Sequence, residues 1–226
     1  FLNFQKKNLK AVKKVISPSK SSKKDICWYF DYPSKDISVI WNGINLDDCK
    51  FHQRETFSAN FVTIISSDVP MKNLKTLIKA LYLLRKDGHD ASLTIIGNLR
   101  EDNKRLIDRL GLTEEITYKS KLPRKQLILT LNNSDIGIAP SKYEGFGFPL
   151  VEMIATGLPV IVSDKASLPE LAGDAGLIFN SDDSNDLKDK MKELVENKTL
   201  RNKLTENSKL RRDDFFGWDE YAKKLE

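Results

Sequence analysis

The sequence predicts an α/β fold in which a doubly wound parallel sheet is covered by helices on both faces. Short β-rich apolar runs alternate with segments of helical periodicity along almost the whole chain of 226 residues. This alternation is typical of strand–helix units joined by right-handed crossovers. Several of the runs are also apolar throughout, which indicates strands buried on both faces of a sheet.

The expected strands are eight short runs bounded by polar or turn-forming residues. They are VKKVIS (12–17), ISVIW (37–41), FVTIIS (61–66), LTIIG (93–97), ITYKS (116–120), DIGIAP (135–140), PVIVSD (159–164) and AGLIF (175–179). Because runs such as PVIVSD have no polar face, they belong inside a sheet with helices above and below it.

The expected helices lie between and after these strands. They cover residues 73–87, 101–110, 124–133, 148–156, 167–172, 185–196, 199–212 and 217–226. In the first, leucine and isoleucine recur every three or four residues on one face, and Gly88 follows as a stop. The last is a short amphipathic segment with Trp218 and Tyr221.

Two segments depart from this alternation. Residues 42–60 are polar, begin with the turn signal Asn42-Gly43 and have no clear period, so we expect a linker there. The chain opens FLNFQKK, without an initiator methionine and in the middle of what reads as a helix. We therefore expect a fragment of a longer protein.

Composition narrows the classes of function. Cys27 and Cys49 have neither the density of a disulfide scaffold nor the spacing of a metal site, so we expect a reducing, cytoplasmic compartment. The isolated His52 and His89 make a histidine-based metal centre improbable. A formal charge of +5 suits phosphates, and we expect no nucleic-acid partner. The lysine-rich start fits an acidic membrane surface, although a solvated helix face is the commoner role of such a run.

The stretch SKYEGFGFPLVEMIATG (141–157) carries the strongest chemical signal. It follows a predicted strand and runs into a predicted helix, and ligands of open α/β sheets bind at such places. Gly145 and Gly147 let a ligand approach the backbone, and N–H groups from Gly147 and Phe148 onward can receive an anion at the helix start. Pro149 suits the first helical position.

Two carboxylates flank this anion site, Glu144 in the loop and Glu152 in what we expect to be the first helical turn. A carboxylate accepts hydrogen bonds from vicinal hydroxyls, so the pair suits a nucleoside-diphosphate sugar, with hydroxyls on both sides of its phosphates. The residues alone leave two other interpretations open. Glu152 could simply favour the helix dipole, and Gly145-Phe146-Gly147 could be a tight turn around a buried aromatic ring.

EGFGFPLVEMIATGLPVIVSD resembles the E-x7-E motif of the retaining family 4 glycosyltransferases, which have the two-domain GT-B fold with Rossmann-like domains. The similarity continues in order along nearly the whole chain. It includes the segments VISPSKSSKKDI, ISVIWNGIN, SSDVPMKNLKTLIKAL, SLPELAGDAGLIFN and FGWDEYA. The resemblance implies that residues 1–44 are the last part of an acceptor-binding N-terminal domain and that residues 45–60 are a linker. Residues 61–212 would form the donor domain, and residues 213–226 would return to the first domain.

The resemblance also implies roles for individual residues. Glu152 would bind the ribose hydroxyls and Glu144 the donor sugar. Lys72 would neutralise the diphosphate as it becomes the leaving group, an electrostatic role that fits transfer. The backbone of Gly145, Phe146, Gly147 and Phe148 would meet the diphosphate or sugar, and the main chain of Leu122 would contact the base.

The implied donor is a UDP- or GDP-sugar, and the implied acceptor is a saccharide or a lipid-linked saccharide, with no metal or other cofactor. We expect a hexosyltransferase of polysaccharide or glycoconjugate synthesis, acting in the cytoplasm or at the membrane surface. Because the acceptor domain is represented only by its last part, we expect this chain alone to bind donor but to transfer little.

One departure from the family weakens the expected diphosphate site. Many members carry an arginine five residues before the lysine, and here that place is Ser67. Arg100 or Arg124 could supply a second cation instead. The family's N-terminal histidine has no match in His52 or His89.

Three rival functions remain to be weighed. A dinucleotide-dependent oxidoreductase would need G-x-G-x-x-G after the first strand of the domain, and IISSDVPMKN has no glycine there. A nucleotide-sugar epimerase or a phosphorylase shares the two-domain architecture but not this order of motifs. A catalytically silent nucleotide-binding or interaction module remains open because of Ser67, since a fold alone does not specify a function.

Overall fold

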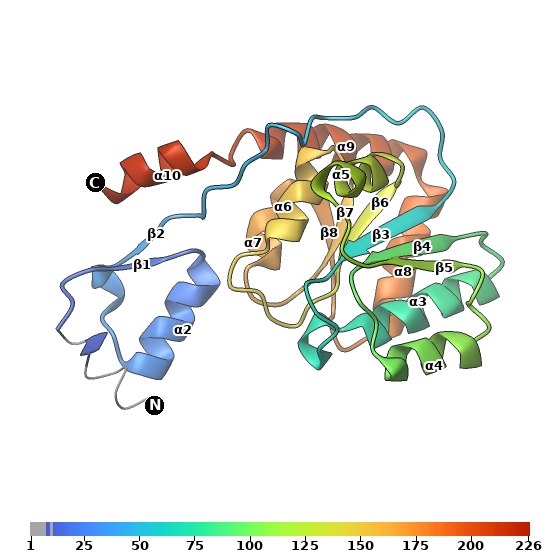
Figure 1. The fold of residues 1–226 in the computed structure, drawn as a ribbon, viewed down its shortest axis with the longest axis horizontal. Helices are drawn as coiled ribbons and strands as arrows, with labels where there is room; N and C mark the ends of the chain where they lie inside the picture. The colour runs from blue at the N-terminus through green and yellow to red at the C-terminus, as the bar shows by residue number, and fades with distance from the viewer. Residues whose placement is uncertain (1–7, 10) are drawn as a thin grey trace.

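The structure contains a six-stranded parallel sheet and, to one side of it, a separate two-stranded parallel sheet (Figure 1). The computed structural model describes residues 8–9 and 11–226. The strands are β1 (Val15–Ser17), β2 (Ile37–Val39), β3 (Asn60–Ile64), β4 (Ser92–Ile96), β5 (Ile116–Lys119), β6 (Ile136–Ala139), β7 (Val160–Ser163) and β8 (Gly176–Phe179). All eight expected runs form strands. The helix expected at the very start falls on residues 1–7, outside the described residues.

The order of the large sheet places a topological switch point at its centre. The order is β5-β4-β3-β6-β7-β8, and every neighbouring pair is parallel. From β3 the chain winds outward through β4 and β5, and it then returns to β6 and winds the other way. Ligands of such sheets bind beyond the carboxyl ends of the strands at this reversal. The loops after β3 and β6 are therefore the expected place for a site.

The helices cover both faces of the large sheet, as the sequence predicts. Each was expected at nearly the residues where it lies. They are α3 (Leu74–Lys86), α4 (Glu101–Arg109), α5 (Arg124–Asn132), α6 (Phe148–Ala155), α7 (Leu168–Ala172), α8 (Ser184–Glu196), α9 (Lys198–Arg212) and α10 (Trp218–Leu225).

Two apolar clusters, one on each face, hold these layers together. One joins the sheet to α3, α4 and α8, and the other joins it to α5, α6 and α7. Strand residues alternate between them: Ile161 belongs to the first cluster, and its neighbours Val160 and Val162 belong to the second. All four residues of β7 are buried, which explains its lack of a polar face.

One helix was not expected. Helix α2 (Lys20–Phe30) buries none of its residues fully, so its sequence KSSKKDICWYF shows little apolar periodicity. A local signal was nevertheless present, because Ser19 is a good N-cap and its hydroxyl accepts a hydrogen bond from the Ser22 N–H at 3.0 Å. Figure 1 shows α2 beside the two-stranded sheet.

The irregular segment that crosses from β2 towards β3 is fastened at two points. Near its start it runs beside the chain's end, with the Ile44 N–H donating to the Phe216 carbonyl at 2.9 Å. Near β3 the carboxylate of Asp135 accepts the N–H groups of Ser58 and Asn60 at 3.0 and 2.9 Å. The segment lacks helix and strand up to Asn60, and its path is nevertheless set by specific contacts.

Candidate functional site

Lys72 and Glu144 meet at the switch point. Lys72 ends a short 3₁₀ helix after β3, and Glu144 lies in the loop after β6. The Lys72 Nζ is 2.6 Å from Glu144 Oε1, and the side chains are 15% and 20% exposed. The Ser141 hydroxyl also donates to this oxygen, at 2.8 Å. The structure thus brings together two residues that the sequence assigned separately to the phosphates and the sugar.

The backbone around this pair is anchored from several sides. The Lys142 N–H donates to the Met71 carbonyl at 2.8 Å, which ties the two loops together. The buried Asn73 amide donates to the carbonyls of Pro140 and Ser181 at 3.0 and 2.8 Å. An ammonium group held in this way is a preorganised positive charge, which is what a developing anion requires.

The glycine-flanked loop continues from Glu144 into α6. Gly147 caps this helix with φ +127°, a conformation that disfavours side chains, and no side chain of the described residues caps the first turn. A Cβ on Gly145 would meet only the Ser22 hydroxyl, at 3.8 Å. Phe146 is buried, whereas Phe148 is exposed. The loop therefore leaves the α6 N-terminus open to an anion.

Helix α2 contributes to this loop, which the sequence did not indicate. The hydroxyls of Ser19 and Ser22 lie 2.8 and 3.1 Å from the Gly145 carbonyl oxygen and donate to it. The Tyr143 hydroxyl donates to Asp25 at 2.9 Å. Burial and the neighbouring Asp25 carboxylate raise the pKa of Tyr143. The side of the loop that faces α2 is thus fixed by the part of the chain that carries the small sheet.

Glu152 does not lie where the sequence placed it. It is the fifth residue of α6, in the second turn rather than the first, and Pro149 is the second helical residue rather than the first. The helix dipole acts mainly on the first turn, so it does not account for a glutamate at this position in the second turn. The Glu152 carboxylate is bound instead by the Arg124 guanidinium, and its side chain is 15% exposed. Arg124 opens α5, two residues after Leu122.

Of the two arginines offered as a second cation for the diphosphate, Arg124 is already engaged by carboxylates, whereas Arg100 makes only one long ion pair within the described residues. Arg124 is engaged by Glu152 and, at 2.8 and 2.9 Å, by Asp48. Arg100 is exposed, and its guanidinium is 3.9 Å from the Asp102 carboxylate. Its backbone N–H donates a hydrogen bond to the Asp68 carboxylate. Leu122 is half-buried against the apolar cluster of α5, α6 and α7. Among the described residues no cluster of acidic, histidine or cysteine side chains could hold a metal ion.

Cys49, which lies next to Asp48, should be chemically inert. It is fully buried, and burial raises the pKa of its thiol to about 12. Because only the thiolate reacts readily, we expect a chromogenic disulfide reagent at pH 8 to label the partly exposed Cys27 alone in the native chain. Denaturant should then expose both thiols. Rapid labelling of Cys49 in the native chain, shown by peptide mapping, would contradict its burial.

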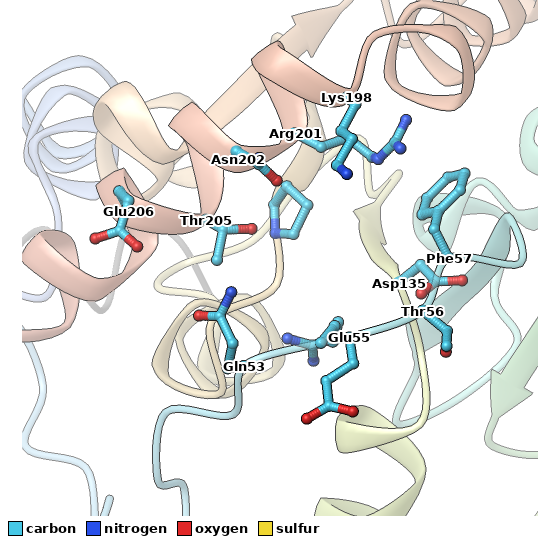
Figure 2. Close-up of a pocket in the computed structure, with 12 residues that line it drawn as sticks. Gln53, Glu55, Thr56, Phe57, Asp135, Lys198, Arg201, Asn202, Thr205 and Glu206 are labelled. Atoms are coloured by element: carbon cyan, nitrogen blue, oxygen red, sulfur yellow. The ribbon is translucent and has the colours of Figure 1, made fainter.

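A polar cavity of about 230 Å³ lies at the opposite, amino-terminal end of the strands (Figure 2). Three cations and three carboxylates line it: Arg54, Lys198, Arg201, Glu55, Asp135 and Glu206. Arg201 stacks on Phe57 and donates to the carbonyls of Leu194 and Val195 at 2.6 and 2.8 Å. Since its charges balance and its arginines serve the fold, we assign no ligand to this cavity.

Comparison with known proteins agrees with the fold and the motifs. The family model "Glycosyl transferases group 1" matches residues 50–211, more than half of the chain. The MMP alpha-(1->4)-mannosyltransferase of Mycolicibacterium hassiacum is 28% identical over 228 residues, which cover 98% of this chain and 55% of that protein. The O-antigen chain mannosyltransferase RfbU of Salmonella typhimurium is 29% identical over 182 residues, covering 79% of this chain and 50% of that protein.

Solved structures share the fold at lower identity. The sucrose-phosphate synthase of Thermosynechococcus elongatus has a TM-score of 0.85 at 19% identity and covers 99% of this chain and 59% of that one. The pneumococcal O-GlcNAc transferase GtfA, in complex with UDP and GlcNAc, has a TM-score of 0.80 at 19% identity, covering 100% and 46%. The chain spans about half the length of the curated relatives it matches. With a GT-B fold and this family match, the chain belongs to the group 1 glycosyl transferases.

Proposed function

We propose that the chain is the donor-binding part of a retaining glycosyltransferase that moves a sugar from a UDP- or GDP-sugar to a saccharide or lipid-linked acceptor. The observation that carries the proposal is the contact between Lys72 and Glu144 across the switch point, beside an α6 N-terminus with no side-chain cap. A cation and free N–H groups suit a diphosphate, and a carboxylate suits sugar hydroxyls.

The leaving diphosphate explains why a fixed ammonium group is useful. When the bond between the sugar and the β-phosphate oxygen breaks, negative charge grows on that oxygen while the sugar becomes oxocarbenium-like. Lys72 would stabilise the first charge and Glu144 would hold the sugar that carries the second. Since the two side chains are paired in this structure, the donor phosphates would have to share Lys72 with Glu144.

The acceptor would be bound by a domain that this chain does not supply. In this proposal residues 1–44 are the last part of that acceptor domain, and residues 45–60 link it to the donor domain. Residues 61–212 bind the donor, and residues 213–226 return to the acceptor domain. Two observations support the division: the small sheet pairs only β1 with β2 within the described residues, and the relatives are about twice as long. The chain alone should then bind donor and transfer sugar very slowly. The relatives that are O-antigen chain mannosyltransferases favour polysaccharide or glycoconjugate synthesis.

The position of the chain relative to a membrane is part of the same proposal. No helix among the described residues is long and apolar enough to cross a bilayer. Lys20 and Lys24 of α2 are exposed, and Trp28 beside them is 77% exposed. A peripheral association with an acidic surface through α2 would suit a lipid-linked acceptor.

Calorimetric titration of the chain with UDP, GDP and their sugars tests the proposal. A silent interaction module would bind none of them, and an oxidoreductase would prefer NAD. We expect Glu152→Ala to weaken UDP or GDP binding about 10-fold, because the ribose would lose a charge-assisted hydrogen-bond partner. Glu193→Ala on α8, far along the chain from these loops, is the control. If Glu152→Ala binds both nucleotides like the parent, the ribose role is wrong.

A further inference from the structure

Arg124 joins three separate parts of the chain through its guanidinium group. Its Nε and Nη2 donate to the two carboxylate oxygens of Asp48 at 2.8 and 2.9 Å. Its Nη1 donates to Glu152 Oε1. The two-pronged contact with Asp48 is the arginine–carboxylate geometry that fixes orientation as well as charge. Asp48 therefore acts as an anchor, and the remaining edge of the guanidinium is aimed at Glu152.

This contact restricts Glu152 before any ligand arrives. A free glutamate side chain loses rotamer entropy when it is ordered. Here the side chain is already held by its Oε1 and is 15% exposed. In the part of the chain that the structure describes, Oε2 accepts no hydrogen bond, so it remains for a ligand. A carboxylate oxygen also has two lone pairs, so Oε1 can still take a second donor.

The contact between Asp48 and Arg124 favours the charged form of both side chains. The hydrogen bond from Arg124 lowers the pKa of Asp48, and the hydrogen bonds to Asp48 and Glu152 raise the pKa of Arg124. The guanidinium also offsets the negative charge of Glu152.

From this geometry we propose that Arg124 is a positioning residue that sets the ribose preference of the nucleotide site by orienting Glu152, with Asp48 as its anchor. The inference rests on the proposed donor function and adds to it a determinant of ribose over deoxyribose. Arg124 does not touch the ligand in this scheme. It acts through Glu152, so its removal should matter only for nucleotides that have both ribose hydroxyls.

The test compares ribonucleoside and 2′-deoxyribonucleoside diphosphates by calorimetry. UDP and dUDP, and GDP and dGDP, are titrated into the parent chain, Arg124→Gln and Glu152→Ala. We expect Arg124→Gln to weaken binding of the preferred ribonucleotide about 10-fold and to leave its deoxy counterpart unchanged, because one charge-assisted bond is lost. In the Glu152→Ala background Arg124→Gln should cause no further loss, since the two residues act as one unit.

Controls separate positioning from a general loss of structure. Arg105→Gln removes a more exposed arginine that pairs with Asp102 on α4, and it should change no affinity. Should Arg124→Gln fail to fold, Asp48→Asn removes the charge of the anchor and keeps the shape. The preference of the Asp48→Asn variant for the ribonucleotide should also fall, because Arg124 then loses its anchor.

The outcomes distinguish this inference from the proposed function. A parent chain that binds no nucleotide overturns both. A parent that prefers the ribonucleotide, with Arg124→Gln or Asp48→Asn retaining that full preference, overturns the positioning role alone. Equal losses for the ribose and deoxyribose forms also overturn it, because they indicate a general disturbance of the pocket.

Discussion

Replacing Lys72 with alanine is expected to lower the affinity for UDP or GDP by roughly 10- to 100-fold and to leave the affinity for uridine or guanosine unchanged. The reason is that a hydrogen bond to a charged group is worth about 1.5–3 kcal/mol. The upper end applies here because Glu144 would lose the ammonium 2.6 Å from its Oε1 and would repel the phosphates. Calorimetric titration with the nucleoside and with its diphosphate measures the gap between the two affinities directly.

A control variant and a double-mutant cycle test whether the loss of affinity is specific to Lys72. Lys79→Ala removes an exposed lysine of α3, two turns beyond Lys72, and should leave the gap intact. Glu144→Gln in the Lys72→Ala background should recover part of the lost affinity, because the unpaired carboxylate is then neutral. In a complete enzyme Lys72→Ala should also slow transfer about 100-fold. An unchanged gap between diphosphate and nucleoside would show that Lys72 does not meet the phosphates.

Replacing Arg54 with methionine is expected to destabilise the fold by roughly 3 kcal/mol and to lower the unfolding temperature by about 6–12 °C. The Arg54 guanidinium donates to the carbonyls of Leu131, at 2.9 Å, and Ser134. It also donates to the carbonyls of His52 and Thr156, at 3.1 and 3.3 Å. Burial lowers the pKa of Arg54 to about 10, so it stays charged at neutral pH. Methionine fills similar space but cannot donate to these carbonyls, so the hydrogen bonds from the guanidinium are lost.

Thermal and urea unfolding measure this loss. Arg105→Met removes an exposed, singly paired arginine and should stay within about 0.5 kcal/mol of the parent. Arg54→Lys should fall between the two, because lysine keeps the charge without the planar fork. A change below about 1 kcal/mol for Arg54→Met would mean that water replaces the guanidinium at little cost.

Arg54 and Arg124 each link α5 to α6, at different positions along the two helices. Arg54 binds carbonyls at the carboxyl ends of α5 and α6, where a cation also complements the helix dipoles. Arg124 opens α5 and binds Glu152 in the second turn of α6. The irregular segment before β3 supplies both Arg54 and Asp48, the anchor of Arg124. The path of this segment and the proposed ribose site are therefore linked through two arginines.

Much of the fold could be predicted from the sequence because its signals are local. Apolar runs without a polar face, such as the one that forms β7, define strands buried on both sides. Helix α2 was missed because it fully buries none of its residues and so lacks the apolar stripe that identifies a helix. Glu152 was assigned to the first helical turn although the predicted helix began at the observed residue, Phe148; counted from there it is the fifth residue and lies in the second turn.

By itself the sequence determined the strand–helix order, and with it the placing of Lys72 and Glu144 in loops after two strands. Only the tertiary structure decided which groups meet. The carboxylate of Asp48 and the guanidinium of Arg124 are 76 residues apart in the chain and yet form a forked ion pair. Likewise the Ser19 hydroxyl reaches the Gly145 carbonyl, 126 residues away. Periodicity reflects neighbours within a few residues, whereas such contacts depend on how strands and loops are brought together, and no local pattern encodes that.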